Sequence, residues 1–299
     1  MQIVMRKIFF ALAISTLFFS CLPKEKEVKI DKFSEKLVVN SRVIPNSVML
    51  VSLTRSFSIL SDGYSHNEGE NGAINNDLMS KILVSDAVVT VSYHNQVDTL
   101  YMLAPGMYAS ITTPQITNEE YTLNVIDKEH GLQVKAVEKM PSQIKFTYTN
   151  FVYENGVLKF KYKFNDPSEI NYYAVNIVRQ NSSNMNPANA DITTFLSNGA
   201  NVIGTFPISD LNFNGTAVDA EISLSEYTPV SQQDTVVVSL SNISEGYYNY
   251  LNLRKKVNNN LMSLIFNEPI NYPTNVEKGL GYFSTHFPDS KVLILPLKQ

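Results

Sequence analysis

The side chain whose position most clearly indicates chemistry is the thiol of Cys21, the one cysteine of the 299-residue chain. An apolar run, residues 8–19, comes shortly before it, and two basic residues precede that run. At about 1.5 Å per residue, a helix of this length cannot cross a hydrocarbon core about 30 Å thick. A basic start, a short apolar run and the small residue Ser20 describe a secretory signal. We therefore expect residues 1–20 to be a signal peptide.

The residues around Cys21 resemble a lipobox, in which a small residue is followed by a cysteine that becomes the first residue of the mature chain. Phe18 stands three residues before the cut, where ordinary secretory cleavage favours a small side chain. In proteins with a lipobox the thiol is acylated, so we predict lipidation of Cys21 and attachment to a membrane through that lipid. The alternative is an ordinary buried cysteine, because free cysteines are usually core residues.

The rest of the chain shows no motif for catalysis or for a cofactor. The histidines are isolated in sequence and form no paired metal-ligand motif: His66, His94, His130 and His286. No Gly-x-Ser-x-Gly elbow and no phosphate-binding loop is present. We therefore predict a protein that is not an enzyme, with no catalytic residues and no cofactor. A hydrolase whose residues meet only in three dimensions is the alternative.

Two groups of residues offer binding chemistry with a structural alternative beside each. Residues 58–81 read as a long polar loop that holds four acids and one histidine: Asp62, His66, Glu68, Glu70 and Asp77. Carboxylate oxygens can ligate calcium, but the spacing does not fit an EF-hand, so we expect a solvated loop and no metal site. Five tyrosines can form an aromatic surface for a sugar or peptide or can pack in a core, and we favour the core: Tyr172, Tyr173, Tyr247, Tyr248 and Tyr250. The ligand-binding residues stay unknown.

Composition restricts the possible partners. Removal of the signal takes away Arg6 and Lys7, which leaves 22 basic against 28 acidic side chains. That balance disfavours nucleic acid as a partner. Apolar residues make up 44% of the chain, and 16 tyrosines and 16 phenylalanines accompany frequent valine, isoleucine and threonine. This composition favours a protein built mainly of β-strands.

The predicted elements divide the mature chain into a tether and two β-domains. Residues 21–35 hold the acylated cysteine and a charged tether. Residues 36–140 read as an antiparallel N-terminal β-sandwich, with short alternating strands between turns at 36–44, 48–57, 87–94, 98–103, 107–111, 121–126 and 132–137. Val89, Val91 and Tyr93 should share a buried face in the third of these strands.

Residues 141–299 are predicted to form a C-terminal β-rich domain. Asn155-Gly156 indicates a tight hairpin, and the strands are expected at 144–153, 157–165, 171–179, 201–207, 217–224, 235–240 and 291–297. A short helix is expected over 191–197. The clearest helix, over about 245–258, begins after Ser244 as its N-cap and ends with basic residues.

Several motifs along the mature chain resemble a lipoprotein family of the phylum Bacteroidota, the domain of unknown function 4249. They are LVVNSRV at residues 37–43, LTRSF at 53–57, AVVTV at 87–91 and Gly106-Met107-Tyr108, followed by a tyrosine-rich helix and by NEPI at 267–270. The most specific stretch is NVEKGLGYF at residues 275–283. In it Gly279 and Gly281 permit backbone geometry that other residues resist, and Tyr282-Phe283 is expected to anchor a core strand.

The resemblance implies a fold, a location and a partner. The N-terminal half should be similar to the transthyretin-like or carboxypeptidase-regulatory sandwich. The family is typically encoded beside TonB-dependent outer-membrane receptors, and no catalytic residues are established for it. Acidic, charged residues after the cysteine resemble signals that export such lipoproteins to the cell surface. Asp98-Thr99-Leu100 and Asp234-Thr235-Val236 fit the O-glycosylation pattern of the same phylum.

These observations lead to one expected function and its alternatives. We expect a non-enzymatic outer-membrane lipoprotein that is an accessory or ligand-capture partner of a TonB-dependent receptor in nutrient uptake. The alternatives are a surface adhesin or a glycan- or peptide-binding module, and, less favoured, a hydrolase.

Overall fold

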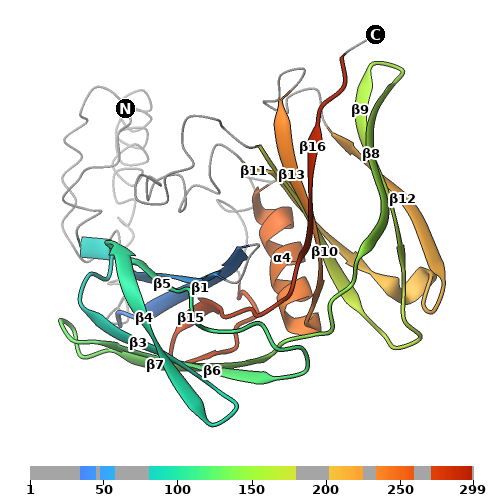
Figure 1. Ribbon diagram of the computed structural model, residues 1–299. Coiled ribbons are helices and arrows are strands. Elements are labelled where there is room, and N and C mark those ends of the chain that lie inside the picture. Colours follow the sequence, from blue (N-terminus) through green and yellow to red (C-terminus); the bar gives the residue numbers. More distant parts are fainter. Residues whose placement is uncertain are drawn as a thin grey trace, which may run out of the picture. The chain divides into compact units, whose positions relative to one another are not determined.

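The computed structural model describes residues 34–44, 48–57, 81–179, 202–224, 234–258 and 271–297 (Figure 1). The chain divides into a unit that ends at Ser34 and a unit from Glu35 to Gln299, and the fold below is that of the second unit. The predicted signal peptide, Cys21, the predicted loop up to residue 80 and the predicted helix over 191–197 lie outside the described residues.

The first seven strands of the second unit and two short strands near its C-terminus form one nine-stranded sheet in the order β14-β7-β6-β3-β4-β5-β2-β1-β15. Neighbouring strands are antiparallel except for β1 and β15, which run parallel. The bounds are β1 (Leu37–Ile44), β2 (Val48–Arg55), β3 (Ala87–Tyr93), β4 (Gln96–Ala104), β5 (Met107–Ser110), β6 (Glu120–Asp127), β7 (Gln133–Lys139), β14 (Val276–Glu277) and β15 (Leu280–Tyr282).

Alternation of side chains along these strands builds the first core. In β3 the side chains of Val89, Val91 and Tyr93 are buried and the intervening positions are partly exposed, which confirms the predicted pattern. The hairpin from β3 to β4 turns at His94 and Asn95, whose φ angles are 43° and 60°. Two consecutive positive φ angles are those of the type I′ turn, whose twist suits a two-residue hairpin.

The C-terminal segment contributes to the first core as well. Val276 and Phe283 are buried among residues of β1 to β7. Between them, Gly281 has a φ of 85°, and a Cβ there would stand 1.9 Å from the carbonyl oxygen of Val39. The parallel pairing of β15 with β1 therefore requires glycine at this position. Tyr282 and Phe283 are both buried, as expected of a core anchor.

The remaining strands form two smaller sheets that enclose a second core. One has the order β12-β9-β8 and the other β11-β10-β13-β16, with antiparallel pairing throughout. Side chains from both sheets are buried together in this second core. The bounds are β8 (Phe146–Glu154), β9 (Val157–Asn165), β10 (Tyr172–Arg179), β11 (Val202–Ser209), β12 (Ala217–Leu224), β13 (Thr235–Ile243) and β16 (Asp289–Ile294).

The hairpin of β8 and β9 follows its local sequence closely. Asn155 and Gly156 have φ angles of 52° and 79°, so the predicted Asn-Gly turn forms. Phe160, Tyr162 and Phe164 are buried in the second core, and the lysines between them point the other way. The final strand β16 ends before the predicted position because Pro296 has no backbone N–H to donate to a ladder.

The one long helix in the described chain is α4 (Glu245–Asn258), which confirms the predicted helix (Figure 1). Its N-cap is Ser244, whose Oγ accepts a hydrogen bond of 3.2 Å from the backbone N–H of Tyr247. Leu251 of the helix packs against Ala174 of β10 and Ile243 of β13. A one-turn 3-10 helix, η2 (Asp210–Asn212), follows β11. In the described residues, no helix is both long enough and apolar enough to cross a bilayer. The fold is thus mainly β with sandwich-like antiparallel sheets and one C-terminal α-helix, as predicted.

Candidate functional site

The histidines lie at three separate places in the part of the chain that the structure describes. His94, in the turn after β3, is exposed, with Nδ1 3.8 Å from Glu119 Oε2. His130, just after β6, has Nδ1 2.6 Å from Glu35 Oε2. His286, beyond β15, is buried. Among the described residues, no two of these histidines contact the same side chain.

The described residues contain no set of side chains that could bind a metal ion. In those segments no three His, Cys, Asp or Glu side chains stand close enough to hold an ion. Cys21 lies outside the described residues, and so do the polar residues of the predicted loop: Asp62, His66, Glu68, Glu70 and Asp77. The predictions at those positions therefore stay predictions.

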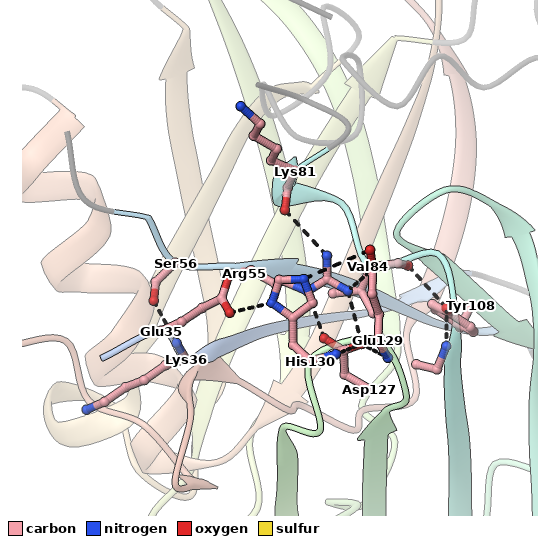
Figure 2. Close-up of polar contacts among 11 residues, drawn as sticks. Glu35, Lys36, Arg55, Ser56, Lys81, Val84, Tyr108, Asp127, Glu129 and His130 are labelled. Atoms are coloured by element: carbon pink, nitrogen blue, oxygen red, sulfur yellow. Dashed lines mark hydrogen bonds and ion pairs between the residues drawn. The ribbon is translucent and has the colours of Figure 1, made fainter. Parts of the chain in front are cut away.

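A buried charged network joins the end of β2 to the turn after β6 (Figure 2). Arg55 donates from Nε to Asp127 Oδ2 at 2.7 Å and from Nη2 to Asp127 Oδ1 at 3.0 Å. Nη2 also donates to Glu129 Oε2 at 2.8 Å, and Nη1 donates to the carbonyl oxygen of Lys81 at 3.4 Å. The backbone N–H groups of Glu129 and His130 donate to Asp127 Oδ1. Both members of the central pair are buried, so this is a two-pronged ion pair with its remaining lone pairs satisfied.

The electrostatics of this network favour the charged state of both partners. Burial alone would raise the pKa of Asp127, but the hydrogen bonds and charge of Arg55, with the two backbone N–H groups, lower it below its ordinary value. Hydrogen bonding to Asp127 raises the pKa of Arg55, against the opposing effect of burial. The pair joins the end of β2 to the end of β6, and we call it the brace.

The same region holds the first residues of the folded unit (Figure 2). The backbone N–H of Lys36 donates to Ser56 Oγ at 2.9 Å, and Glu35 contacts His130 as described above. Nearby, the hydroxyl of Tyr108 donates to the carbonyl oxygen of Val84 at 3.1 Å. The point where the predicted tether meets the body is therefore fixed by polar contacts to β2 and to the β6–β7 turn.

The five tyrosines singled out by sequence fall into two environments. Tyr173 is fully buried in the second core, where its hydroxyl donates to Asp166 and burial raises the pKa of the phenol. This one is core packing, as favoured from the sequence. The ring of Tyr172 packs against that of Tyr248, with centroids 4.8 Å apart and an interplanar angle of 39°, and both residues are half-buried.

The other tyrosines of α4 join an aromatic cluster with residues near the C-terminus. Tyr247 and Tyr250 both lie against Tyr282, with ring centroids 5.3 Å and 5.6 Å away. Tyr250 also approaches Tyr272 at 5.9 Å, and Tyr247 stacks on His286 at 6.1 Å. We call these five residues the tyrosine cluster. Tyr272 is 36% exposed and Tyr247 and Tyr250 are half-buried, so part of the cluster meets solvent.

A buried carboxyl group lies beside the tyrosine cluster. Glu138 of β7 accepts a hydrogen bond of 2.8 Å from Asn275 Nδ2. Burial raises the pKa of Glu138 to about 6, and the side chains of Ser244, Tyr282 and Asn275 partly offset that rise. The hydroxyl oxygens of Ser244 and Tyr282 stand 3.4 Å apart. Glu138 therefore links a strand of the first sheet, the cap of α4 and the C-terminal segment.

The ring of His286, which stacks on Tyr247, is another titratable group at the tyrosine cluster. Its Nδ1 is 3.2 Å from Ser284 Oγ. Ser284 is held in turn by Ser41 of β1, whose Oγ accepts from the backbone N–H of Ser284 at 2.6 Å. Burial lowers the pKa of His286 to about 4, so the ring is neutral at physiological pH.

This arrangement can exchange a proton near neutral pH and can offer flat aromatic faces. A carboxyl with a pKa of about 6 beside two hydroxyls changes charge within the range that cells use. Groups with perturbed pKa values gather at functional sites, although structural clusters have them as well. Half-exposed tyrosines provide an apolar ring and a polar hydroxyl for stacking and hydrogen bonding. The tyrosine cluster with Glu138 is therefore the best candidate binding site in the described chain.

Sequence reasoning missed Arg55, Asp127 and Glu138, although each carries a recognisable signal. Each is the last inward-facing position of an alternating strand. Arg55 follows Val51 and Leu53, Asp127 follows Leu123 and Val125, and Glu138 follows Val134 and Ala136. A charge at a position whose strand neighbours are core residues indicates a buried ionic partner or a polar cluster.

The first Asp-Thr motif lies within β4, and the second begins one residue before β13. Thr99 is exposed on β4, and Asp98 accepts a hydrogen bond of 2.9 Å from Thr113 Oγ1. Asp234 pairs with Arg179 at 2.9 Å, and Thr235 begins β13. Glycosylation at these threonines stays a prediction.

Comparison with known proteins supplies a family and weak structural likenesses. A DUF3823 family protein from Parabacteroides merdae matches 52% of this chain and 79% of its own at 8% identity, with a TM-score of 0.22. Alpha-2-macroglobulin from Escherichia coli, spanning domains MG0-NIE-MG1, matches 68% of this chain and 65% of its own at 10% identity, with a TM-score of 0.20. No curated protein matches the chain. The sequence pattern of a domain of unknown function, DUF4249, matches residues 24–291. Because that match spans most of the sequence, the chain belongs to the DUF4249 family.

Proposed function

We propose that this protein is a non-enzymatic lipoprotein of the outer membrane that assists a TonB-dependent receptor in capturing or importing a nutrient. The observation that carries the proposal is the position of Cys21, which follows a short apolar run and Ser20 and lies three residues before the family match begins at Lys24. This order describes a cleaved signal, an acylated residue and then a folded body.

The physics of attachment fits such a role. One acyl chain holds a protein on a bilayer only marginally, whereas several chains on one residue make the attachment long-lived. A body held on the membrane meets a receptor in the same membrane at a high effective concentration. An accessory subunit can then act through a weak contact with its receptor.

Affinity capture tests the partnership. The chain carries a C-terminal tag and is purified from detergent-solubilised membranes of the native organism, and its companions are identified by mass spectrometry. We expect a TonB-dependent receptor in stoichiometric amounts. The control is a Cys21→Ala variant, which should be lost from the membrane fraction together with the receptor. Intact tagged protein that recovers no receptor subunit would overturn the proposed partnership.

A glycan- or peptide-binding module is the second candidate, and the tyrosine cluster favours it. Tyr250 and Tyr272 are partly open to solvent beside a carboxyl with a raised pKa. Binding of the purified protein to an array of glycans and peptides tests this function. The Tyr250→Ala and Tyr272→Ala variants should lose the binding, while Tyr101→Ala, at an exposed tyrosine on β4, should keep it. Equal binding by all three variants would exclude the cluster as the ligand site.

A further inference from the structure

Six exposed apolar side chains lie on or beside the face of the first sheet that points away from its core, with Leu103 at the irregularity in the β4–β5 register. Pairing places Val88 of β3 beside Ile126 of β6, and the register of β3 with β4 places Tyr101 on the other side of Val88. Tyr101 is 71% exposed and Ile111, just after β5, is 78% exposed. We call this set the β4 face: Val88, Val97, Tyr101, Leu103, Ile111 and Ile126.

The β4 face is electrically neutral. The side chains between its apolar positions are hydroxyls, such as those of Thr90 and Thr99, which pair across β3 and β4. Charged residues at its margin have opposite charges as neighbours. Across β6 and β7, Glu120 is paired with Lys139, and Lys128 lies 3.2 Å from Asp86. Contact through this face therefore depends on apolar burial and not on charge.

The size of the β4 face suits a weak contact. Six partly exposed side chains present on the order of a few hundred Å² of apolar surface, about the size of the largest apolar patch on a typical monomer. A specific protein interface buries about 800 Å² on each partner. The β4 face alone falls short of a stable dimer, so its partner must be held nearby by another attachment.

The predicted anchor supplies such an attachment within reach. Cys21 lies fourteen residues before Glu35, and a chain of that length spans at most about 50 Å. In the sheet order, β5 and β2 separate β4 from β1, so β4 lies about 15 Å from the strand that the tether enters. Acyl chains on Cys21 can therefore enter the same bilayer surface that the β4 face would touch.

We propose that the β4 face rests on the lipid bilayer, with its aliphatic side chains in the interface and Tyr101 at the level of the headgroups. The proposal rests on the acyl anchor of the proposed function. Tyrosine favours this depth because its ring is apolar and its hydroxyl is hydrated. The threonine hydroxyls of β3 and β4 hydrogen-bond to headgroup oxygens. Because the face carries no net charge, it binds zwitterionic lipid, and the contact persists at high salt.

Quenching of a fluorophore by brominated lipid tests the contact on the full acylated chain. The only native thiol is the acylated one, so a thiol-reactive dye labels an introduced cysteine alone. The test variant is Val97→Cys and the matched control is Val292→Cys on β16, because these valines are 66% and 65% exposed. Both labelled proteins are reconstituted into phosphatidylcholine vesicles with and without bromine, and flotation records their attachment.

We expect both proteins to float and only the Val97→Cys label to lose fluorescence in brominated vesicles, equally at low and high salt. Adding Tyr101→Asp and Leu103→Asp should abolish the quenching and leave flotation intact.

Flotation without quenching at Val97→Cys overturns the proposal, and cross-linking between copies through that position would assign the face to a second copy. If the chain does not float, the anchor fails. The label is then read on the unacylated chain with Cys21→Ser added, so that the dye still labels position 97 alone, in the presence of excess vesicles. Quenching there still supports the face and its absence excludes it.

Discussion

At the residue scale, three buried charged side chains occupy the last core-facing position of their strands: Arg55, Asp127 and Glu138. Arg55 and Asp127 meet in a two-pronged ion pair that also engages Glu129. Among the described residues, the side chains that hydrogen-bond Glu138 are neutral, and the pKa of Glu138 is raised whereas that of Asp127 is lowered. Asp127 and Glu138 occupy the same kind of position in their strands. Asp127 is held charged by the buried cation Arg55, whereas Glu138, without such a partner in the described chain, titrates near pH 6.

Removal of one partner of the brace should destabilise the protein strongly. Asp127→Ala leaves Arg55 buried with only Glu129 as a counter-charge, so we expect a loss of about 3 kcal/mol in the free energy of unfolding. Lys163→Met, which breaks an exposed pair with Asp219, should cost less than about 1 kcal/mol. Urea unfolding of both variants measures the difference. Equal losses would show that the Arg55 pair contributes no more than a surface pair.

Glu138 should make stability depend on pH in the opposite sense to an ordinary paired acid. Its folded-state pKa is raised from 4.5 to about 6, so its contribution is fully present below about pH 4.5 and is lost as the pH rises through 6. A rise of this size corresponds to about 2 kcal/mol. Relative to the wild type, Glu138→Gln should therefore gain about 2 kcal/mol in unfolding free energy between pH 4.5 and pH 7.5. Parallel pH profiles of the two proteins would contradict the raised pKa.

At the element scale, two glycines with similar backbone angles should respond differently to the same substitution. Gly281 has a φ of 85° and Gly156 a φ of 79°, but a Cβ at Gly156 meets no atom within 4 Å. Gly156→Ala should therefore cost only the backbone strain, about 1 kcal/mol. Gly281→Ala adds a clash with the Val39 carbonyl and should cost about 3 kcal/mol. Thermal unfolding of both variants checks this, and similar losses would mean that β15 moves freely away from β1.

Elements with local signals could be predicted from the sequence, and elements made by distant pairing could not. The β9 alternation, the Asn155-Gly156 turn and the Ser244 cap each depend on residues within a few positions. The parallel pairing of β15 with β1 joins Gly281 to Val39, which no periodicity reveals. The tyrosine cluster is similar, because Tyr247 and Tyr250 were visible on one helix face but Tyr272, Tyr282 and His286 come from later segments.

At the scale of the whole molecule, the C-terminal segment makes the first core depend on the end of the chain. Val276 and Phe283 are buried in that core, and Asn275 bonds both Glu138 and the backbone of Phe283. The sequence predicted a division between residues 36–140 and 141–299. A fragment of residues 36–140 lacks two strands and two core side chains of its own sheet.

That fragment should be much less stable than the same sheet in the full chain. Loss of Phe283 alone corresponds to about 3–5 kcal/mol of core packing. Circular dichroism during urea unfolding compares the fragment with the full chain and with its Phe283→Ala variant. We expect the fragment to unfold at the lowest urea concentration and the variant at an intermediate one. A fragment as stable as the full chain would show that the C-terminal return is dispensable.

The most direct test of the proposed lipoprotein is the covalent state of Cys21. Cells grown with labelled palmitate provide the protein, and mass spectrometry of its N-terminal peptide identifies the first residue and any lipid on it. We predict a chain that begins at Cys21, carries acyl chains and floats with outer-membrane vesicles, and a Cys21→Ser variant without label. A free thiol at Cys21 in a protein that takes up no palmitate and stays in the aqueous fraction would contradict the account.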